Sequence, residues 1–217
     1  MAKDDALFLK DHLGNAICWQ RKTAVISDLD GTLYHQRPVR VKMALRLAGY
    51  YLLRPWRVRE LAGIFFFRKV REEERFRTED FSAQIREASE RAGLRNAETL
   101  QGAVSRWMFR EPLKEIASHP RQEVLSFLQR MRTEGRRIVI YSDYAAEEKL
   151  KALRFMPDAV YYPGLYGLTE LKPSLKSMTE ILKREGLRPE QMVMIGDRRE
   201  KDGESAALVG AQFILVK

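Results

Sequence analysis

The chain has 217 residues, 45% hydrophobic and 32% charged, which is typical of a soluble globular protein with a well-buried core. One cysteine, Cys18, excludes an internal disulfide, and together with three histidines it excludes a Cys/His metal cluster. The formal net charge of +9 favours an anionic partner: nucleic acid, an acidic membrane surface or a phosphorylated substrate. The net charge alone does not distinguish among these three kinds of partner.

The first residues do not resemble a secretion signal, because Asp4, Asp5 and Lys10 interrupt any apolar run. The longest uncharged apolar stretches, residues 47–53 and 61–67, are too short to cross a bilayer. We therefore expect a cytoplasmic protein. Residues 6–9 are expected to form a short helix, and residues 17–19 a lead-in that covers an edge of the sheet.

The first predicted strand covers residues 23–27, a short β-branched apolar run, and the segment Asp28-Leu29-Asp30-Gly31-Thr32-Leu33 follows it. Two carboxylates thus lie at the carboxyl end of a strand, where open α/β sheets place their chemistry. Gly31 permits a sharp turn of the backbone there. Like charges this close shift each other's pKa, so that one carboxylate can attack while the other carries a proton.

Residues 34–120 are predicted to be mainly helical, with an extended segment at Pro38 where the chain leaves the Asp-containing loop. Apolar residues at helical spacing predict a helix over 41–54, and Pro55 suits the first turn of a second helix that runs to about residue 76. Thr78-Glu79-Asp80 is expected to cap a helix over 81–92 that ends at Gly93, and Asn96 a helix through residue 108.

Strands alternate with helices after residue 120, which predicts an α/β fold: a doubly wound, parallel-sheet, Rossmann-like core with an all-helical insert after its first strand. We expect helices over 121–134, 145–153 (capped by Asp143), 174–185 and 204–209, and strands over 138–141, 159–162, 192–195 and 213–216.

The ends of these strands and one loop carry chemically useful groups in a fixed order. The pattern resembles the haloacid dehalogenase-like (HAD) hydrolase superfamily, whose four motifs match here as Asp28-x-Asp30-Gly31-Thr32, Ser142, Lys172-Pro173 and Gly196-Asp197-x-x-x-x-Asp202. The resemblance covers residues 22–34 and 120–217. Taken singly, Ser142 fits a helix cap better and Lys172-Pro173 fits a plain loop dipeptide better. Asp197 with Asp202 fits a solvated turn and helix start as well as it fits a site. Their joint order favours an active site.

The resemblance implies phosphoryl transfer, with Asp28 as the nucleophile that forms an aspartyl-phosphate. Asp30 would protonate the leaving alcohol and then activate the water that cleaves the intermediate. Ser142 and Thr32 would donate hydroxyl hydrogen bonds to phosphoryl oxygens. Lys172 would supply a fixed positive charge to the developing transition state.

The resemblance also implies a Mg²⁺ ion, which suits an all-oxygen site. Its expected ligands are Asp28, the backbone carbonyl of Asp30, and Asp197. Asp202 is expected to be a ligand through water, or a partner of the metal or of Lys172.

Asp30 bears on the reaction within the superfamily. The resemblance implies that dehalogenases lack a carboxylate at this position and that phosphonate-cleaving members carry a small residue, so that Asp30 fits oxygen-linked phosphate esters. A phosphomutase is less favoured but stays open. Ser174-Leu175 departs from the commonest family sequence after Lys172-Pro173. A receiver-like domain uses similar groups, but it has no large helical insert after its first strand.

The insert is basic and aromatic, and three interpretations stay open: a cap with its own aromatic core and a solvated basic face, a basic face that selects an anionic substrate, or a surface that touches acidic lipid or RNA. The run Glu72-Glu73-Glu74 weakens the lipid interpretation. His35 is a candidate substrate contact, and His119-Pro120 a candidate hinge. The basic and aromatic residues of the insert are Arg40, Lys42, Arg46, Tyr50, Tyr51, Arg54, Trp56, Arg57, Arg59, Phe65, Phe66, Phe67, Arg68, Lys69 and Arg71.

We therefore expect a HAD-like core over residues 1–36 and 118–217, and a helical cap over residues 37–117. The expected function is a Mg²⁺-dependent phosphatase that hydrolyses a phosphate monoester through Asp28. The alternative is a regulatory, membrane-surface or RNA-binding module that retains a HAD-like site. The expected partner is a small phosphorylated substrate; nucleic acid is disfavoured, and peripheral contact with an acidic membrane is open but not favoured. Neither the substrate nor the oligomeric state can be read from the sequence.

Overall fold

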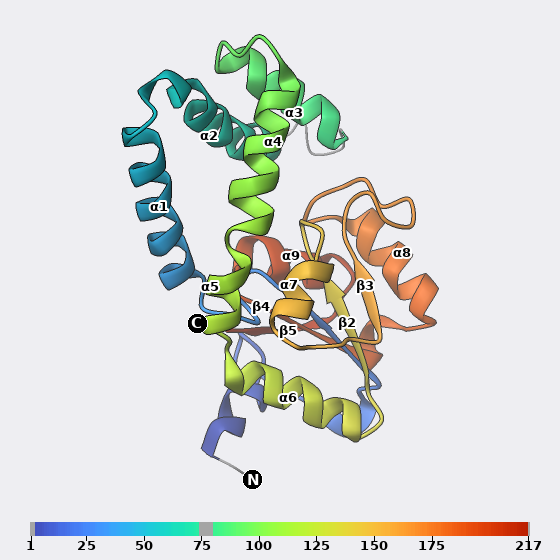
Figure 1. Ribbon diagram of the computed structural model, residues 1–217. Helices are drawn as coiled ribbons and strands as arrows, with labels where there is room; N and C mark the ends of the chain where they lie inside the picture. The colour runs from blue at the N-terminus through green and yellow to red at the C-terminus, as the bar shows by residue number, and fades with distance from the viewer. Residues whose placement is uncertain (1–2, 74–79, 217) are drawn as a thin grey trace. The chain divides into compact units, whose positions relative to one another are not determined.

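The computed structural model describes residues 3–73 and 80–216 (Figure 1). Contacts within the chain divide it into two compact units. The core unit comprises Met1–Gln36 and Pro120–Lys217, and the helical unit comprises Arg37–His119. Each unit is described here by itself.

The core unit contains a parallel sheet with the strand order β3-β2-β1-β4-β5. The chain crosses from β1 to β2 on one side and later returns to β4 on the other, so β1 is central and lies at a topological switch point. This is the doubly wound parallel sheet that the alternation of strands and helices predicts. The strands are β1 (Ala24–Ser27), β2 (Arg137–Tyr141), β3 (Ala159–Tyr161), β4 (Met192–Gly196) and β5 (Gln212–Leu215).

The register of the strands brings their carboxyl ends to one level. Ser27 at the end of β1 lies opposite Ile140 of β2 and Ile195 of β4. The residues that follow, Asp28 and Asp197 among them, therefore emerge at the same edge of the sheet. Every residue of β1 and β4 is buried, as expected for strands covered on both faces.

Helices α8 (Leu175–Glu185) and α9 (Glu204–Leu208) cover one face of the sheet. Ile26, Val139 and Met194 point to this face and pack with Met178 and Ile181 of α8. Side chains alternate across a strand, so the neighbouring residues of β1, β2 and β4 point to the other face. Helix α6 (Gln122–Thr133) packs against β2. Helix α7 (Glu147–Ala152) follows β2 in the chain.

The N-terminal segment begins with a 3₁₀ helix over Lys3–Phe8, and a second 3₁₀ turn covers Trp19–Arg21. Between them the backbone N–H of His12 donates to the carbonyl of Phe213 in the edge strand β5, so this segment covers the sheet edge as expected. The ring of Phe8 stacks on Phe127 of α6, with 3.8 Å between ring centroids. This contact fixes the segment to the core unit.

In the helical unit, the described residues are mainly helical. Asp80 and Asn96 cap their helices as predicted, since Asp80 accepts from the N–H of Ala83 and Asn96 from that of Glu98. Thr78, Glu79 and the expected helix end near residue 76 lie outside the described residues. The helices are α1 (Gln36–Leu52), α2 (Val58–Glu72), α3 (Phe81–Arg91), α4 (Ala97–Val104) and α5 (Leu113–Ser118), with a 3₁₀ turn over Pro55–Arg57 and a π-helical turn over Ser105–Arg110.

Two sequence-based predictions are wrong in this region and in the core. Pro38 does not lie in an extended segment: it is the third residue of α1, where a missing N–H leaves no helical hydrogen bond unmade. Asp143 does not cap α7, which begins at Glu147 after Ala146 without a side-chain cap. The Asp143 carboxylate instead accepts the backbone N–H of Lys172 at 2.9 Å.

None of the helices formed by residues 3–73 and 80–216 has the length and apolar character that a bilayer span requires.

The central strand should dominate the stability of the core unit. Ile26 is fully buried in β1 between its two neighbouring strands. We predict that Ile26→Ala lowers the free energy of unfolding by about 2–5 kcal/mol, because the cavity cannot collapse in a sheet packed on both faces. Urea denaturation followed by circular dichroism measures this. The exposed Leu208→Ala is the control and should change stability by less than about 0.5 kcal/mol; equal losses for both variants would contradict the assignment.

Candidate functional site

The loop after β1 folds back on itself and brings Thr32 to Asp28. The backbone N–H groups of Thr32 and Leu33 both donate to the carbonyl of Leu29. The Thr32 hydroxyl then donates to Oδ2 of Asp28 at 2.9 Å. The backbone N–H of Asp28 donates to the carbonyl of Ile195 in β4, which ties the start of the loop to the neighbouring strand.

Gly31 makes this turn possible. Its φ of +96° lies in the left-handed region that favours glycine. A Cβ atom added here would lie 2.1 Å from Oδ2 of Asp197. The close approach of loop and Asp197 therefore requires a glycine at this position.

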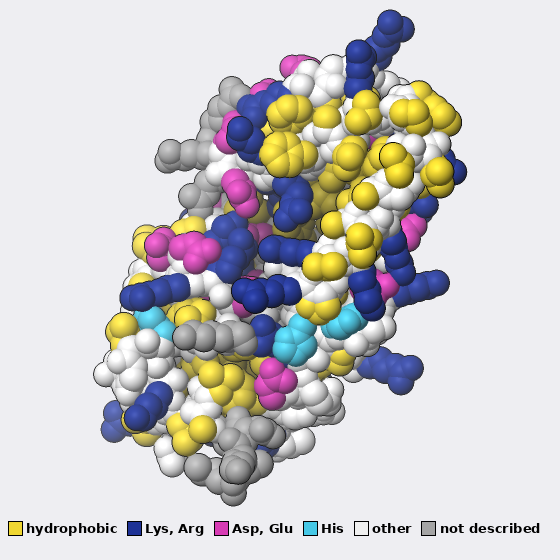
Figure 2. Space-filling model, turned by 90° about the vertical axis from the view of Figure 1, so that its left-hand side faces the viewer, with side chains coloured by type: hydrophobic (Ala, Val, Ile, Leu, Met, Phe, Trp, Pro, Cys, Tyr) yellow, Lys and Arg dark blue, Asp and Glu magenta, His cyan; other side chains and the backbone are white. Residues whose placement is uncertain are grey.

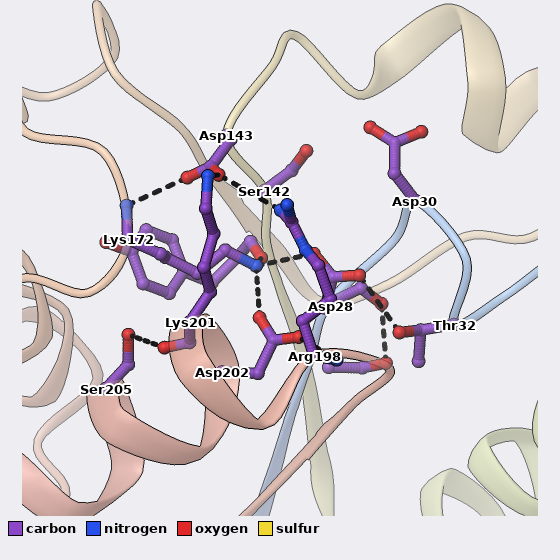
Figure 3. A network of polar contacts seen from close by, with 12 residues as sticks. Asp28, Asp30, Thr32, Ser142, Asp143, Lys172, Arg198, Lys201, Asp202 and Ser205 are labelled. Carbon is purple, nitrogen blue, oxygen red and sulfur yellow. Dashed lines mark hydrogen bonds and ion pairs between the residues drawn. The ribbon is translucent and has the colours of Figure 1, made fainter. Parts of the chain in front are cut away.

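The ammonium of Lys172 is fully buried and connects the segments of the site (Figure 3). It donates to Oδ1 of Asp28, to Oδ1 of Asp202 at 2.6 Å and to the carbonyl of Tyr141 at 3.2 Å. Burial opposes its charge, but the carboxylates of Asp202, Asp28 and Asp143 raise the pKa of Lys172 well above its ordinary value. Lys172 is therefore a permanent cation at the site.

Asp28 is buried, with one oxygen on Lys172 and the other on Thr32. Burial raises the pKa of Asp28 to about 7, although the Lys172 ammonium opposes this, and the charges of Asp202 and Asp30 raise it further. A cation or the phosphorus of a phosphoryl group, bound at Asp28, would offset the cost of burying the ionised carboxylate, because either one interacts favourably with its negative charge.

Asp28, Asp197 and Asp202 can present one carboxylate oxygen each within 4.8 Å of one another. Oδ1 of Asp197 is buried and has no hydrogen-bond partner among the described residues. Burial raises the pKa of Asp197, and the nearby Asp202 charge adds to this. An unpartnered buried oxygen beside two further carboxylates fits a hard divalent cation such as Mg²⁺.

Asp202 is the fully buried member of this cluster. Its Oδ1 accepts from Lys172 and its Oδ2 from the backbone N–H of Arg198 at 3.1 Å. A Cβ atom at Gly196 would lie 2.4 Å from the Asp202 side chain, so the glycine at the end of β4 admits the carboxylate. In this structure Asp202 positions Lys172 and the loop after β4.

Asp30 is directed away from the Asp28 cluster (Figure 3). Both of its oxygens lie 2.6 Å from Nζ of Lys149, and the hydroxyl of Tyr34 donates to Oδ1 at 2.5 Å. Burial alone would raise the pKa of Asp30, but Lys149 and Tyr34 hold it below its ordinary value. The Asp30 side chain is not part of the acidic group formed by Asp28, Asp197 and Asp202.

Ser142 follows β2 and is almost fully buried. Its hydroxyl oxygen accepts the backbone N–H of Tyr144 at 3.1 Å. None of the hydrogen bonds of the described residues links Ser142 to Asp28. Ser142 instead directly follows Tyr141, whose carbonyl accepts from Lys172.

The sequence did not identify four groups that complete the site. Lys149 and Tyr34 hold Asp30, while Arg198 and Lys201 lie 3.5 and 3.2 Å from Oδ2 of Asp143. Burial opposes the charge of Asp143, but Lys172 and Lys201 lower its pKa below the ordinary value. Of the two partners of Asp30, only Tyr34 is close enough in sequence, at four residues, to have been suspected from the sequence. Lys149 is 119 residues from Asp30 in sequence.

Removal of the buried cation should destabilise the core unit. Lys172→Met would leave the carboxylates of Asp28 and Asp202 buried without their partner. We predict a loss of about 3–5 kcal/mol in the free energy of unfolding, measured by urea denaturation without divalent metal. The matched control is Lys176→Met, an exposed lysine near the start of α8, which should lose less than about 0.5 kcal/mol. A Lys172→Met variant as stable as the control would show that the ion pairs contribute little.

Comparisons with known proteins identify the family and the fold. The family model of haloacid dehalogenase-like hydrolases matches residues 22–210. No curated protein sequence matches the chain at a significant level.

Several solved structures share the fold. A 2-haloacid dehalogenase from Pseudomonas syringae pv. Tomato is similar with a TM-score of 0.61 at 19% identity, covering 88% of this chain and 85% of that one. A protein described as a predicted phosphoglycolate phosphatase from Haemophilus somnus gives 0.53 at 15% identity, covering 89% and 84%. A candidate HAD hydrolase from Bacillus subtilis, solved with magnesium bound, gives 0.56 at 14% identity, covering 89% and 87%.

These neighbours include a dehalogenase and a protein described as a phosphatase, so they show the fold and leave the reaction open. The match of the family model over most of the chain identifies the family. The protein belongs to the haloacid dehalogenase-like hydrolases.

Proposed function

We propose that the protein is a Mg²⁺-dependent phosphatase that hydrolyses a phosphate monoester through an aspartyl-phosphate on Asp28. The observation that carries the proposal is the second carboxylate, Asp30, in the same loop as the buried Asp28. An alkoxide is a poor leaving group and needs a proton, whereas a halide ion leaves without one. A second carboxylate in the loop of the nucleophile can supply that proton once it is protonated, which favours a phosphate ester over a haloacid.

In the first step, an oxygen of Asp28 attacks the phosphorus of the ester. The bond between phosphorus and the ester oxygen breaks, its electron pair stays on that oxygen, and Asp30 donates a proton to it. The products of this step are the free alcohol and a phosphoryl group on Asp28.

In the second step, Asp30 takes a proton from a water molecule, which attacks the phosphorus. The bond between phosphorus and the Asp28 oxygen breaks, so inorganic phosphate leaves and the Asp28 carboxylate is restored. Atoms and protons balance over the cycle, because the proton that Asp30 takes from water replaces the one that left with the alcohol.

The basic groups of the site supply the charge that a phosphate dianion needs. Lys172 is held at Asp28, and Lys149 lies at Asp30, so each carboxylate has an ammonium beside it. These cations would stabilise the negative charge on the equatorial oxygens during transfer. An incoming phosphate would compete with Asp30 for Lys149, which would allow Asp30 to carry its proton.

Mg²⁺ would be held by Asp28 and Asp197, with Asp202 as the third nearby carboxylate. As expected from the family resemblance, the backbone carbonyl of Asp30 would be a further ligand. When bound, the ion supplies positive charge that lets the phosphate approach the carboxylates.

We further propose that the helical unit is the cap that selects the substrate, a small phosphorylated molecule, and that the protein acts in the cytoplasm. The position of this unit in the chain, between β1 and β2, supports the assignment as a cap. The binding-module alternative from the sequence is less favoured for this site, because binding alone needs no proton donor such as Asp30.

The nucleophile is tested by Asp28→Asn. We predict that the release of inorganic phosphate from a panel of phosphate esters falls on the order of 10³-fold or more, because an amide does not attack phosphorus. The matched control is Glu190→Gln, an exposed carboxylate of the core unit, which should retain full activity. Release of halide from haloacids, with none of phosphate from any ester, would favour a dehalogenase and contradict the proposal.

The metal site is tested without reference to activity. We predict that Mg²⁺ at about 100 times its dissociation constant stabilises the wild type by about 2.7 kcal/mol, seen as a rise in the thermal unfolding temperature. Asp197→Asn should lose most of this rise, because its unpartnered oxygen is a proposed ligand. The ionic strength is matched with KCl, and Glu190→Gln is the control. An undiminished response in Asp197→Asn would place the metal elsewhere.

A further inference from the structure

Helix α1 exposes an apolar stripe to solvent. Val41, Leu45 and Leu52 have exposed fractions of 59%, 69% and 82%, and the exposed Ala44 and Ala48 lie between them. These positions recur every three or four residues, so they lie on one side of the helix. The helix packs into its own unit with a different side, which includes the buried Val39 and Met43.

The stripe continues into the connection between α1 and α2. Leu53 and Trp56 have exposed fractions of 74% and 76%, followed by Val58 at 55% and Phe65 at 65% on α2. Single exposed apolar residues are common, whereas seven of them over two consecutive helices and their connection are typical of an interaction surface. We name Val41, Leu45, Leu52, Leu53, Trp56, Val58 and Phe65 the apolar face.

Basic residues border the apolar face, and acids are absent from the part of it that precedes Glu60. Residues 31–59 contain no Asp or Glu, and residues 36–59 contain seven Lys and Arg. By helical periodicity, Arg40 lies on one side of the stripe and Lys42 and Arg46 on the other. Figure 2, which looks onto the side where α1 lies in Figure 1, shows hydrophobic side chains in a row with Lys and Arg on both sides.

Part of this charge is neutralised within the helical unit, and part is not. Lys42 and Arg46 pair with Glu115, and Arg57 pairs with Glu60. Four arginines of this segment have no carboxylate partner among residues 3–73 and 80–216, and they leave the apolar face with a net positive border. They are Arg37, Arg40, Arg54 and Arg59.

We propose that the apolar face binds the surface of an anionic lipid bilayer. Leu, Val and Phe side chains would enter the boundary between headgroups and acyl chains, and Trp56 would lie at the headgroup level. The bordering arginines have long apolar stems, which let their charged ends reach the anionic headgroups. The inference goes beyond the hydrolase reaction, since it concerns where the enzyme acts.

Charge and side-chain chemistry favour a bilayer over two other occupants. In a symmetric dimer the same face would meet itself, which would bring the unpaired arginines of both copies together. Nucleic acid would match the charge, but Val41, Leu45 and Leu52 offer neither hydrogen bonds to phosphate nor rings for base stacking. A bilayer surface satisfies both the aliphatic side chains and the charges.

The test is co-sedimentation of the full chain with vesicles in about 0.1 M salt. One set contains phosphatidylcholine alone, and the other also contains about 30% phosphatidylserine. We expect binding to the anionic vesicles and little to the neutral ones. The tryptophan emission should shift to shorter wavelength on binding. Trp56→Phe should bind while losing most of that shift, because Trp107 is already buried and Trp19 is half-buried in the core unit.

Variants of the face separate the two contributions. Leu45→Glu with Leu52→Glu should abolish sedimentation with anionic vesicles, and Arg37→Gln with Arg40→Gln should weaken it about tenfold or more. The matched control is Leu13→Glu, which has an exposed fraction of 66% but lies in the core unit, and should bind as the wild type does. Circular dichroism verifies that each variant is folded.

Three results would overturn the inference: no sedimentation with anionic vesicles, equal losses for Leu13→Glu and the double variant, or dimers in analytical ultracentrifugation that dissociate in Leu45→Glu. Asp28→Asn should bind vesicles like the wild type. Failure of the lipid inference is therefore distinguishable from failure of the proposed phosphatase reaction.

Discussion

The buried ammonium of Lys172 holds together segments that are far apart in the chain. It donates to Asp28 after β1, to Asp202 after β4 and to the end of β2, while its own backbone N–H donates to Asp143. The carboxylates of Asp28, Asp143 and Asp202 are buried close together, which is costly unless cations balance them. The parallel register that aligns the carboxyl ends of β1, β2 and β4 makes this balance possible, because it delivers all of these groups to one edge.

The two carboxylates of the first loop have opposite environments. Asp28 is buried beside further acids, and its pKa is raised, whereas Asp30 lies against Lys149 and Tyr34, and its pKa is lowered. Without a substrate, this arrangement keeps Asp30 in the charged form. A phosphate dianion carries the charge that would engage Lys149 in its place, so the proposed acid–base role of Asp30 depends on the substrate itself.

The sequence predicts the strands and the residues at their ends well, because buried parallel strands are continuous apolar runs and the motifs follow them directly. It does not predict the ion pairs of Asp30 or Asp143, since Lys149 and Arg198 approach them only through the tertiary fold. The extended segment predicted at Pro38 is wrong because proline is tolerated in the first turn of a helix, where α1 places it. The apolar face of α1 also required the structure: apolar residues at helical spacing do not reveal which side is buried.

The most direct test of the proposed mechanism is to stop turnover with acid and search for a phosphoryl group on the peptide that contains Asp28. Slowing the second step with Asp30→Asn should increase its amount, since the water would lack its base. The account predicts a phosphate on Asp28 that hydroxylamine removes, as expected for an acyl phosphate. Hydrolysis of an ester with no adduct on Asp28, or an alkyl ester on Asp28 formed from a haloacid, would contradict it.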